Sequence, residues 1–150
     1  MEYQRYNPEG WIEEKEELNK HDLENACHTG KVVQGVVHRY DEDCNLYVNL
    51  GNNIDGIIPR NEFDAISFDS DGNCKTNICK NKLNKYVQFK IKEIYKDKII
   101  LSRKAVMQDA LNWAKEELEP GMVVNGIVSN IRKFGAFVEI GGGITRTSSY

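Results

Sequence analysis

Lysine and arginine side chains are concentrated in one stretch of this sequence. Ten of them fall between positions 75 and 104, where the acids are Glu93 and Asp97. Such a run can be a solvated surface, or it can attract the phosphates of a nucleic acid. The net charge of −3 does not exclude the second interpretation, because residues 1–25 carry eight acids against three bases and leave +2 for the rest. Charge alone does not choose between the two.

Cysteine and histidine are the other residues that could perform chemistry. Cys74 and Cys79 are separated by four residues, a wider spacing than the compact pairs of most structural zinc sites, although Cys27 or His28 could complete four ligands on paper. Nothing indicates export, so we expect free thiols. The three histidines show no metal spacing and no nucleophile partner. We therefore expect no metal, no cofactor and no catalytic residue.

Residues 69–73, Asp-Ser-Asp-Gly-Asn, resemble the start of a calcium-binding loop. The glycine comes two places early, and Lys80 stands where the bidentate glutamate belongs. We interpret this segment as a turn.

Short strands must position the basic residues. Runs rich in β-branched and aromatic residues, separated by turn residues, predict strands at 32–37, 46–50, 54–58, 86–95 and 99–101. Five short strands are what a small closed barrel needs. We predict a mainly β fold with one complete barrel over residues 28–104.

Helices are expected on both sides of the barrel. Residues 1–27 form an acidic lead-in, with one helix starting at Asn7 and Pro8 and a second near 22–28 that ends at Gly30. Residues 105–118 predict a linker helix, since apolar residues recur at helical spacing before the stop signal at 120–121.

The chain contains an internal repeat. Residues 30–37, Gly-Lys-Val-Val-Gln-Gly-Val-Val, return 91 positions later as Gly-Met-Val-Val-Asn-Gly-Ile-Val at 121–128. The similarity continues from 46–51, Leu-Tyr-Val-Asn-Leu-Gly, to 136–141, Ala-Phe-Val-Glu-Ile-Gly. A repeat at this separation predicts tandem domains, the second covering residues 119–150.

The second copy resembles the opening of the S-one RNA-binding domain, a five-stranded OB-fold. The resemblance rests on Gly121 and Gly126, on Phe-Gly-Ala-Phe-Val at 134–138 and on three glycines at 141–143. The first copy contributes Gly-Ile-Ile-Pro at 56–59 and the ending Ile-Ile-Leu-Ser-Arg-Lys at 99–104. The chain is thus similar to the N-terminal part of the multi-repeat bacterial ribosomal protein S-one family.

This resemblance implies non-catalytic binding of single-stranded RNA, namely mRNA at the small ribosomal subunit, by a cytoplasmic monomer with no membrane segment. In the second copy Phe134 and Phe137 match two stacking aromatics. In the first copy Tyr47 matches the second aromatic, whereas Cys44 stands at the first. The expected RNA-binding residues are Tyr47, Arg60, Lys90, Lys92, Lys98, Phe134 and Phe137.

Two other functions fit the same pattern. Because the first copy retains few of the family's contact residues, it could dock on a ribosomal protein as an adaptor without contacting RNA. The domain could also be the RNA-binding appendage of a nuclease or reductase whose catalytic domain is absent here. No carboxylate cluster or activated nucleophile favours an enzyme.

The end of the second copy departs from the family. Where the family continues Thr-Gly-Leu-Leu-His-Ile, this chain has Thr-Arg-Thr-Ser-Ser-Tyr at 145–150, a change that a one-nucleotide insertion would produce. We expect about two strands here, too few for a barrel. Val123, Ile127, Phe137 and Ile140 should then be exposed, and proteolysis should leave a core ending near Leu118.

Overall fold

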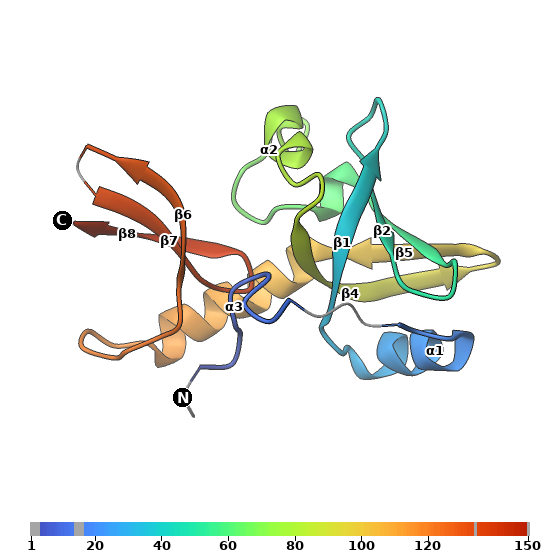
Figure 1. The fold of residues 1–150 in the computed structure, drawn as a ribbon, viewed down its shortest axis with the longest axis horizontal. Coiled ribbons are helices and arrows are strands. Elements are labelled where there is room, and N and C mark those ends of the chain that lie inside the picture. Colours follow the sequence, from blue (N-terminus) through green and yellow to red (C-terminus); the bar gives the residue numbers. More distant parts are fainter. Residues whose placement is uncertain (1–3, 14–16, 134, 150) are drawn as a thin grey trace.

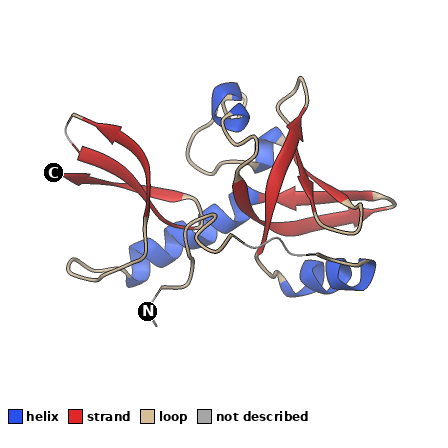
Figure 2. Ribbon diagram, in the orientation of Figure 1, coloured by secondary structure: helices blue, strands red, loops and turns tan. Residues whose placement is uncertain are grey.

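A closed five-stranded barrel forms the larger part of the fold (Figures 1 and 2). The computed structural model describes residues 4–13, 17–133 and 135–149. The strands are β1 (Val33–Tyr40), β2 (Leu46–Asn49), β3 (Asp55–Ile58), β4 (Tyr86–Tyr95) and β5 (Lys98–Ser102), in the order β1-β2-β3-β5-β4. β3 and β5 pair in parallel and the other neighbours are antiparallel. The predicted mainly β OB-fold is confirmed.

Alternating apolar side chains fill the barrel. The first half of β1 and all of β2 bury every second residue, as strands with one face on a core must do. The interior includes Leu46, Val48, Ile58, Phe89 and Leu101, each completely buried.

Helix α1 (Lys20–Thr29) packs against β4. Asn19 caps it in a capping box with Asp22, and Gly30 ends it in a left-handed conformation with φ +70°. The predicted C-terminal glycine is therefore confirmed. The connection from β3 to β4 holds a short 3-10 helix, η1 (Arg60–Glu62), and α2 (Thr76–Lys80), neither of which the sequence analysis predicts.

The helix predicted to start at Asn7 and Pro8 is not formed, because residues 4–13 are irregular. Gly10 has a φ of +80°, which interrupts a helix, and it lies against the ring of Tyr86. Besides two short-range hydrogen bonds, from the Gln4 amide to the Tyr6 carbonyl and from the Trp11 N–H to the Pro8 carbonyl, this segment bonds to distant parts of the chain. Long-range contacts override the local capping signal.

Helix α3 (Arg103–Glu117) leads from the barrel to the second repeat (Figure 1). The hydroxyl of Ser102 accepts a hydrogen bond from the Ala105 N–H at 3.1 Å and caps the helix. Its buried face includes Val106, Ala110 and Trp113. No helix among the described residues is long and apolar enough to cross a membrane.

The second repeat is a three-stranded antiparallel sheet, β6 (Ile127–Arg132), β7 (Gly135–Gly141) and β8 (Ile144–Ser149). The prediction of about two strands is corrected, since residues 144–149 pair with β7. The expected exposure of Ile140 is also wrong, because Ile140 and Ile144 are buried against Ala110 of α3. Ile127 and Phe137 are partly buried, and Val123 is exposed as predicted.

The two repeats share one detail of packing. A Cβ atom on Gly35 would lie 2.6 Å from Cγ1 of Val48 and 3.4 Å from the carbonyl oxygen of Asn49. A Cβ atom on Gly126 would lie 2.6 Å from Cγ1 of Val138 and 3.4 Å from the carbonyl oxygen of Glu139. The repeat seen in the sequence is thus a repeat of strand contacts.

Candidate nucleic-acid interface

Tyr47 lies in the middle of the β1-β2-β3 surface of the barrel. It pairs with Arg39 of β1 and with Ile57 of β3, and its side chain is half-buried. The guanidinium carbon of Arg39 is 3.7 Å from the ring centroid of Tyr47, which is a cation–π contact. The Tyr47 hydroxyl donates to Asp41 at 3.1 Å.

Asp41 organises the turn between β1 and β2. Its carboxylate accepts hydrogen bonds from the backbone N–H groups of Asp43 and Asn45 and from the Asn45 amide, all at 3.0 Å. Desolvation opposes ionisation, but these bonds and that of Tyr47 outweigh it and lower the pKa of Asp41. Desolvation and the bond to Asp41 raise the pKa of Tyr47, so this phenol stays protonated.

Arg60 belongs to the same network. Its N–H donates to the Asn45 side chain at 3.1 Å, which joins it through Asn45 and Asp41 to Tyr47. The guanidinium donates to the carbonyl of Cys74 at 2.5 Å and to Asp69 at 2.7 Å. Arg60 therefore holds the connection that follows β3, while its backbone holds the turn beneath Tyr47.

Cys44 stands where the family has its first aromatic, and the structure explains why it is buried. Its φ is +62°, and its side chain is 1% exposed. The thiol lies 3.6 Å from the carbonyl oxygen of Thr76, at the start of α2. It therefore fills the core beneath the turn and takes no part in the exposed face.

Lys90 and Lys92 lie apart from Tyr47, on β4. Lys90 pairs with Asp109 of α3, and Lys92 donates to Glu62 at 2.6 Å. Together with Lys104 they line a hollow of about 370 Å³ at the start of α3. Burial opposes ionisation of Glu62, but Lys92 and Ser102 lower its pKa overall. These pairings neutralise two lysines of the predicted basic run, Lys90 and Lys92.

Lys98 lies at the beginning of β5, beside the hairpin that joins β4 to β5, and it is exposed. The structure thus brings Tyr47 and Arg60 into one network and Lys90 and Lys92 into another, with Lys98 at the hairpin. The contribution of each to RNA binding stays a prediction.

Phe137 of the second repeat occupies the same ladder position as Tyr47. It pairs with Asn130 of β6 and Thr147 of β8, as Tyr47 pairs with Arg39 and Ile57. Its side chain is partly buried. Phe134, the other predicted aromatic, lies outside the described residues.

Sequence reasoning missed Arg39 and Asp41 as parts of the site. Arg39 lies on β1 across from Tyr47, a neighbour that strand alternation could have indicated once the register was known. Asp41 follows the first predicted strand, at the start of the turn, and aspartate is a residue type that forms side-chain bonds to turn backbone.

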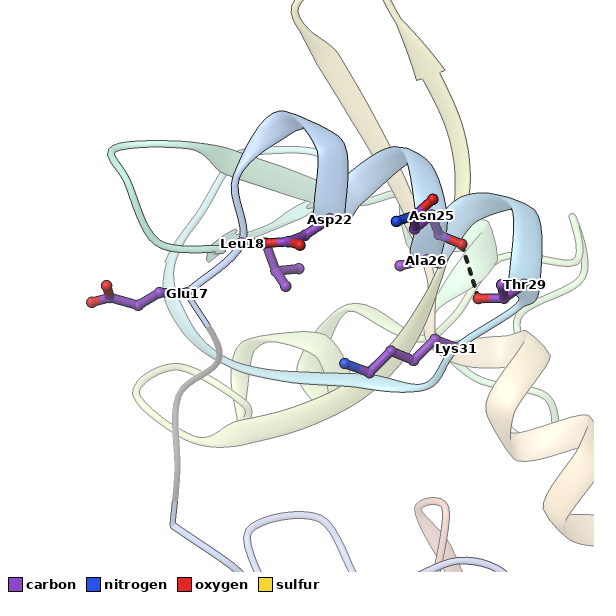
Figure 3. Close-up of a pocket in the computed structure, with 7 residues that line it drawn as sticks. All are labelled: Glu17, Leu18, Asp22, Asn25, Ala26, Thr29 and Lys31. Carbon is purple, nitrogen blue, oxygen red and sulfur yellow. Dashed lines mark hydrogen bonds between the residues drawn. The ribbon is translucent and has the colours of Figure 1, made fainter.

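A hollow of about 400 Å³ lies beside α1 rather than on the strand surface (Figure 3). Glu17 and Asp22 line it together with a single cation, Lys31, and the Thr29 hydroxyl donates to the Asn25 carbonyl at its end. Two carboxylates against one lysine do not favour a phosphate. The strand surface around Tyr47 remains the better candidate.

The four cysteines are free thiols, as predicted. Within the ranges that the structure describes, no three or more cysteine, histidine or acidic side chains converge as metal ligands. The neighbouring thiol of Cys79, together with burial, raises the pKa of Cys74, whose sulfur lies 3.6 Å from the Lys75 carbonyl oxygen. A buried thiol of this kind is a poor nucleophile.

Comparison with known proteins agrees with this geometry. Residues 27–104 and 117–146 match the family model described as the S1 RNA binding domain. The small ribosomal subunit protein bS1 of Leuconostoc lactis is 34% identical over 116 residues, covering 77% of this chain and 25% of that protein. The bS1 proteins of Coxiella burnetii (28% over 127 residues; 81% and 21%) and Neisseria meningitidis (38% over 64 residues; 39% and 11%) are also similar.

This chain therefore spans a quarter or less of the length of these relatives. The S1 match falls on both repeats and covers the strands that carry Tyr47 and Phe137. The chain belongs to the S1 RNA-binding domain family.

Proposed function

We propose that this chain binds single-stranded RNA, without catalysing a reaction, through the equivalent strand surfaces that carry Tyr47 and Phe137. The observation that carries the proposal is their shared ladder position in two repeats of one family. An aromatic ring on an OB-fold surface stacks on an unpaired base, a contact worth about 1–3 kcal/mol per base. Arg39 beside Tyr47 supplies a cation for the adjoining phosphate or a second plane for stacking.

We further propose that the RNA is mRNA and that the chain acts in translation at the small ribosomal subunit, as a cytoplasmic monomer. The support is that the similar proteins are named small ribosomal subunit proteins. Weak binding by each repeat suits this role, because linked repeats gain affinity from effective concentration.

A second candidate function is a protein-docking adaptor that contacts no RNA. The observation that favours it is that the ring and the hydroxyl of Tyr47 already contact neighbouring side chains of this chain. Arg39 covers the ring, and the hydroxyl is bonded to an anionic Asp41 that would repel a phosphate. An RNA appendage of a nuclease or reductase has no such observation in its support.

Binding to a labelled uridine-rich single-stranded RNA, titrated with salt, separates these functions. For an RNA binder, the logarithm of the affinity should fall linearly with the logarithm of the salt concentration, because the release of counterions from the RNA on binding is less favourable at higher salt. Tyr47→Ala should weaken binding by roughly tenfold, the loss of one stacked base. Tyr47→Phe keeps the ring and removes only the bond to Asp41, so it should bind like the native chain.

An adaptor gives a different result. If the native chain does not bind at low salt, or if Tyr47→Ala and Tyr47→Phe bind equally well, the strand surface around Tyr47 is not an RNA site. Binding to the small subunit that persists after nuclease treatment would then identify the adaptor.

A further inference from the structure

The segment 4–12 lies between the barrel and the second repeat, next to α3 (Figure 1). Its first contact is with the second repeat. The side-chain amide of Gln4 accepts a hydrogen bond from the Asn125 N–H at 2.9 Å and donates to the Asn125 carbonyl at 3.2 Å. This pair of bonds is the one that a neighbouring strand would make to Asn125.

The same segment binds the equivalent position of the first repeat. Gln34 precedes Asn125 by 91 residues, the offset of the repeat. The Gly10 N–H donates to the Gln34 side chain at 3.1 Å, and Gln34 donates to the carbonyl of Ile12 at 2.7 Å. One segment thus bonds the matching position of the sequence repeat in both copies, Gln34 in β1 and Asn125 two residues before β6.

Glu9 lies at the centre of the segment and joins three elements. Its carboxylate accepts two bonds from the Arg103 guanidinium, at 2.9 and 2.5 Å, and one from the Gln88 N–H of β4 at 2.7 Å. Its own N–H donates to the carboxyl of Glu139 on β7 at 2.7 Å. The side chains of Glu9 and Arg103 are only 2% and 3% exposed.

The glycines at 141–143 are required where this segment and α3 meet the second repeat. A Cβ atom on Gly141 would lie 2.2 Å from the carbonyl oxygen of Tyr6, and one on Gly142 would lie 2.6 Å from the Cβ of Ala110. Gly143 would place a Cβ 2.6 Å from the Arg103 guanidinium. All three have positive φ, and the Gly142 N–H donates to the Asn7 carbonyl at 3.2 Å. The glycine turn is therefore shaped to receive the segment.

We propose that Glu9 and Arg103 are positioning residues for RNA binding. Through them the segment 4–12, which we name the clasp, holds the two repeats in one relative orientation. An RNA long enough to reach both Tyr47 and Phe137 then meets a preorganised pair of surfaces, and the second contact follows the first at high effective concentration. The RNA consequence rests on the proposed function, whereas the clasp itself does not.

Hydrogen exchange on the full chain tests the clasp without RNA. Glu9→Gln should raise exchange at Asn125 and Gly142, whose N–H groups bond to the clasp, by about tenfold or more. The Val37 N–H, which bonds inside the barrel to Lys85, should change little. Gln4→Ala removes the Asn125 bonds without exposing the buried Arg103, so it tests the clasp even if Glu9→Gln unfolds. Glu13→Gln, an exposed acid in the same part of the chain, is the matched control.

The RNA consequence is tested with two uridine-rich RNAs, one of about 5 nucleotides and one of about 20. Gln4→Ala and Glu9→Gln should weaken binding of the long RNA by about tenfold and leave that of the short RNA unchanged. Unchanged exchange at Asn125 and Gly142 would overturn the clasp. Faster exchange at Asn125 and Gly142, with an unchanged ratio of the affinities for the long and the short RNA, would overturn the positioning role of the clasp. If the native chain binds neither RNA, the proposed function fails and exchange alone decides on the clasp.

Discussion

The guanidinium of Arg39 lies over the ring of Tyr47, 3.7 Å from its centroid, on the surface that we assign to RNA. The two residues are partners across β1 and β2, so the contact follows from strand register rather than from a chance rotamer. In the second repeat the matching pair is Asn130 and Phe137, with an amide at the position of the Arg39 guanidinium. The two repeats should therefore differ in how much of their RNA binding depends on charge.

Replacing Arg39 should separate stacking from charge. Arg39→Ala should weaken RNA binding by roughly five- to tenfold and reduce the slope of log affinity against log salt by about one, because one phosphate contact is lost. Arg39→Lys keeps the charge but not the plane, and it should restore the slope while leaving affinity reduced. Tighter binding by Arg39→Ala would show instead that Arg39 shields the ring from bases.

The contact between Glu9 and Glu139 should make stability depend on pH. Burial, and next the negative charge of Glu9, raise the pKa of Glu139 from 4.5 to about 7, while Lys82 and Arg103 act in the opposite direction. The folded chain thus holds this proton more tightly than the unfolded chain. The contribution of Glu139 to the free energy of unfolding is complete below pH 4.5 and is lost as pH rises through about 7.

Glu9 has the opposite dependence. Its burial disfavours the charged form, but the charge and hydrogen bonds of Arg103 outweigh burial and lower its pKa. Its contribution is therefore lost on acidification through that lowered pKa. Together the two groups place the greatest stability of the contact in mildly acidic solution.

Urea unfolding at about pH 5.5 and about pH 8 measures the effect, which we expect to be on the order of 1–3 kcal/mol. Glu139→Gln is uncharged and still offers an oxygen to the Glu9 N–H, so this variant should lose most of the difference between the two pH values. An equally steep dependence in Glu139→Gln would place the titrating group elsewhere.

Local sequence patterns were sufficient wherever one element determines its own structure. Apolar and β-branched residues predicted a strand from Tyr86 to Tyr95, and those are the bounds of β4. Helical spacing predicted α3 to within one residue at its C-terminal end. Helix α2 was missed, because a helix of five residues is too short to show a period.

Prediction failed where distant residues decide the structure. The cap signal at Asn7 was overruled by the bonds of Gln4 and Glu9 to residues more than 75 positions away. The run of lysines predicted one patch, yet Asp109 and Glu62 neutralise Lys90 and Lys92 from other elements. Neither ion pair can be predicted from the sequence alone, because the two partners come together only when the barrel closes.

The equivalent glycines Gly35 and Gly126 should tolerate alanine to different degrees. Both would place Cβ 2.6 Å from a valine methyl, but Val48 is completely buried whereas Val138 is only partly buried. Gly35→Ala should therefore lower the free energy of unfolding by about 1–3 kcal/mol, as overpacking does. Gly126→Ala should change it by roughly 0.5 kcal/mol or less, since Val138 has room to turn. Equal effects in urea unfolding would mean that the two repeats are equally well packed.

Thiol reactivity should report on the region around α2. Cys44, Cys74 and Cys79 are at most 1% exposed, while Cys27 on α1 is partly exposed. An aromatic disulfide reagent should therefore label one thiol quickly in the native chain and all four in denaturant. Cys27→Ser should abolish the fast phase. The slow phase requires local or global opening, so its rate should rise with added urea in parallel with unfolding. A fast phase that remains in Cys27→Ser would show that the connection held by Arg60 opens on its own, because the Arg60 guanidinium donates a hydrogen bond to the carbonyl of Cys74.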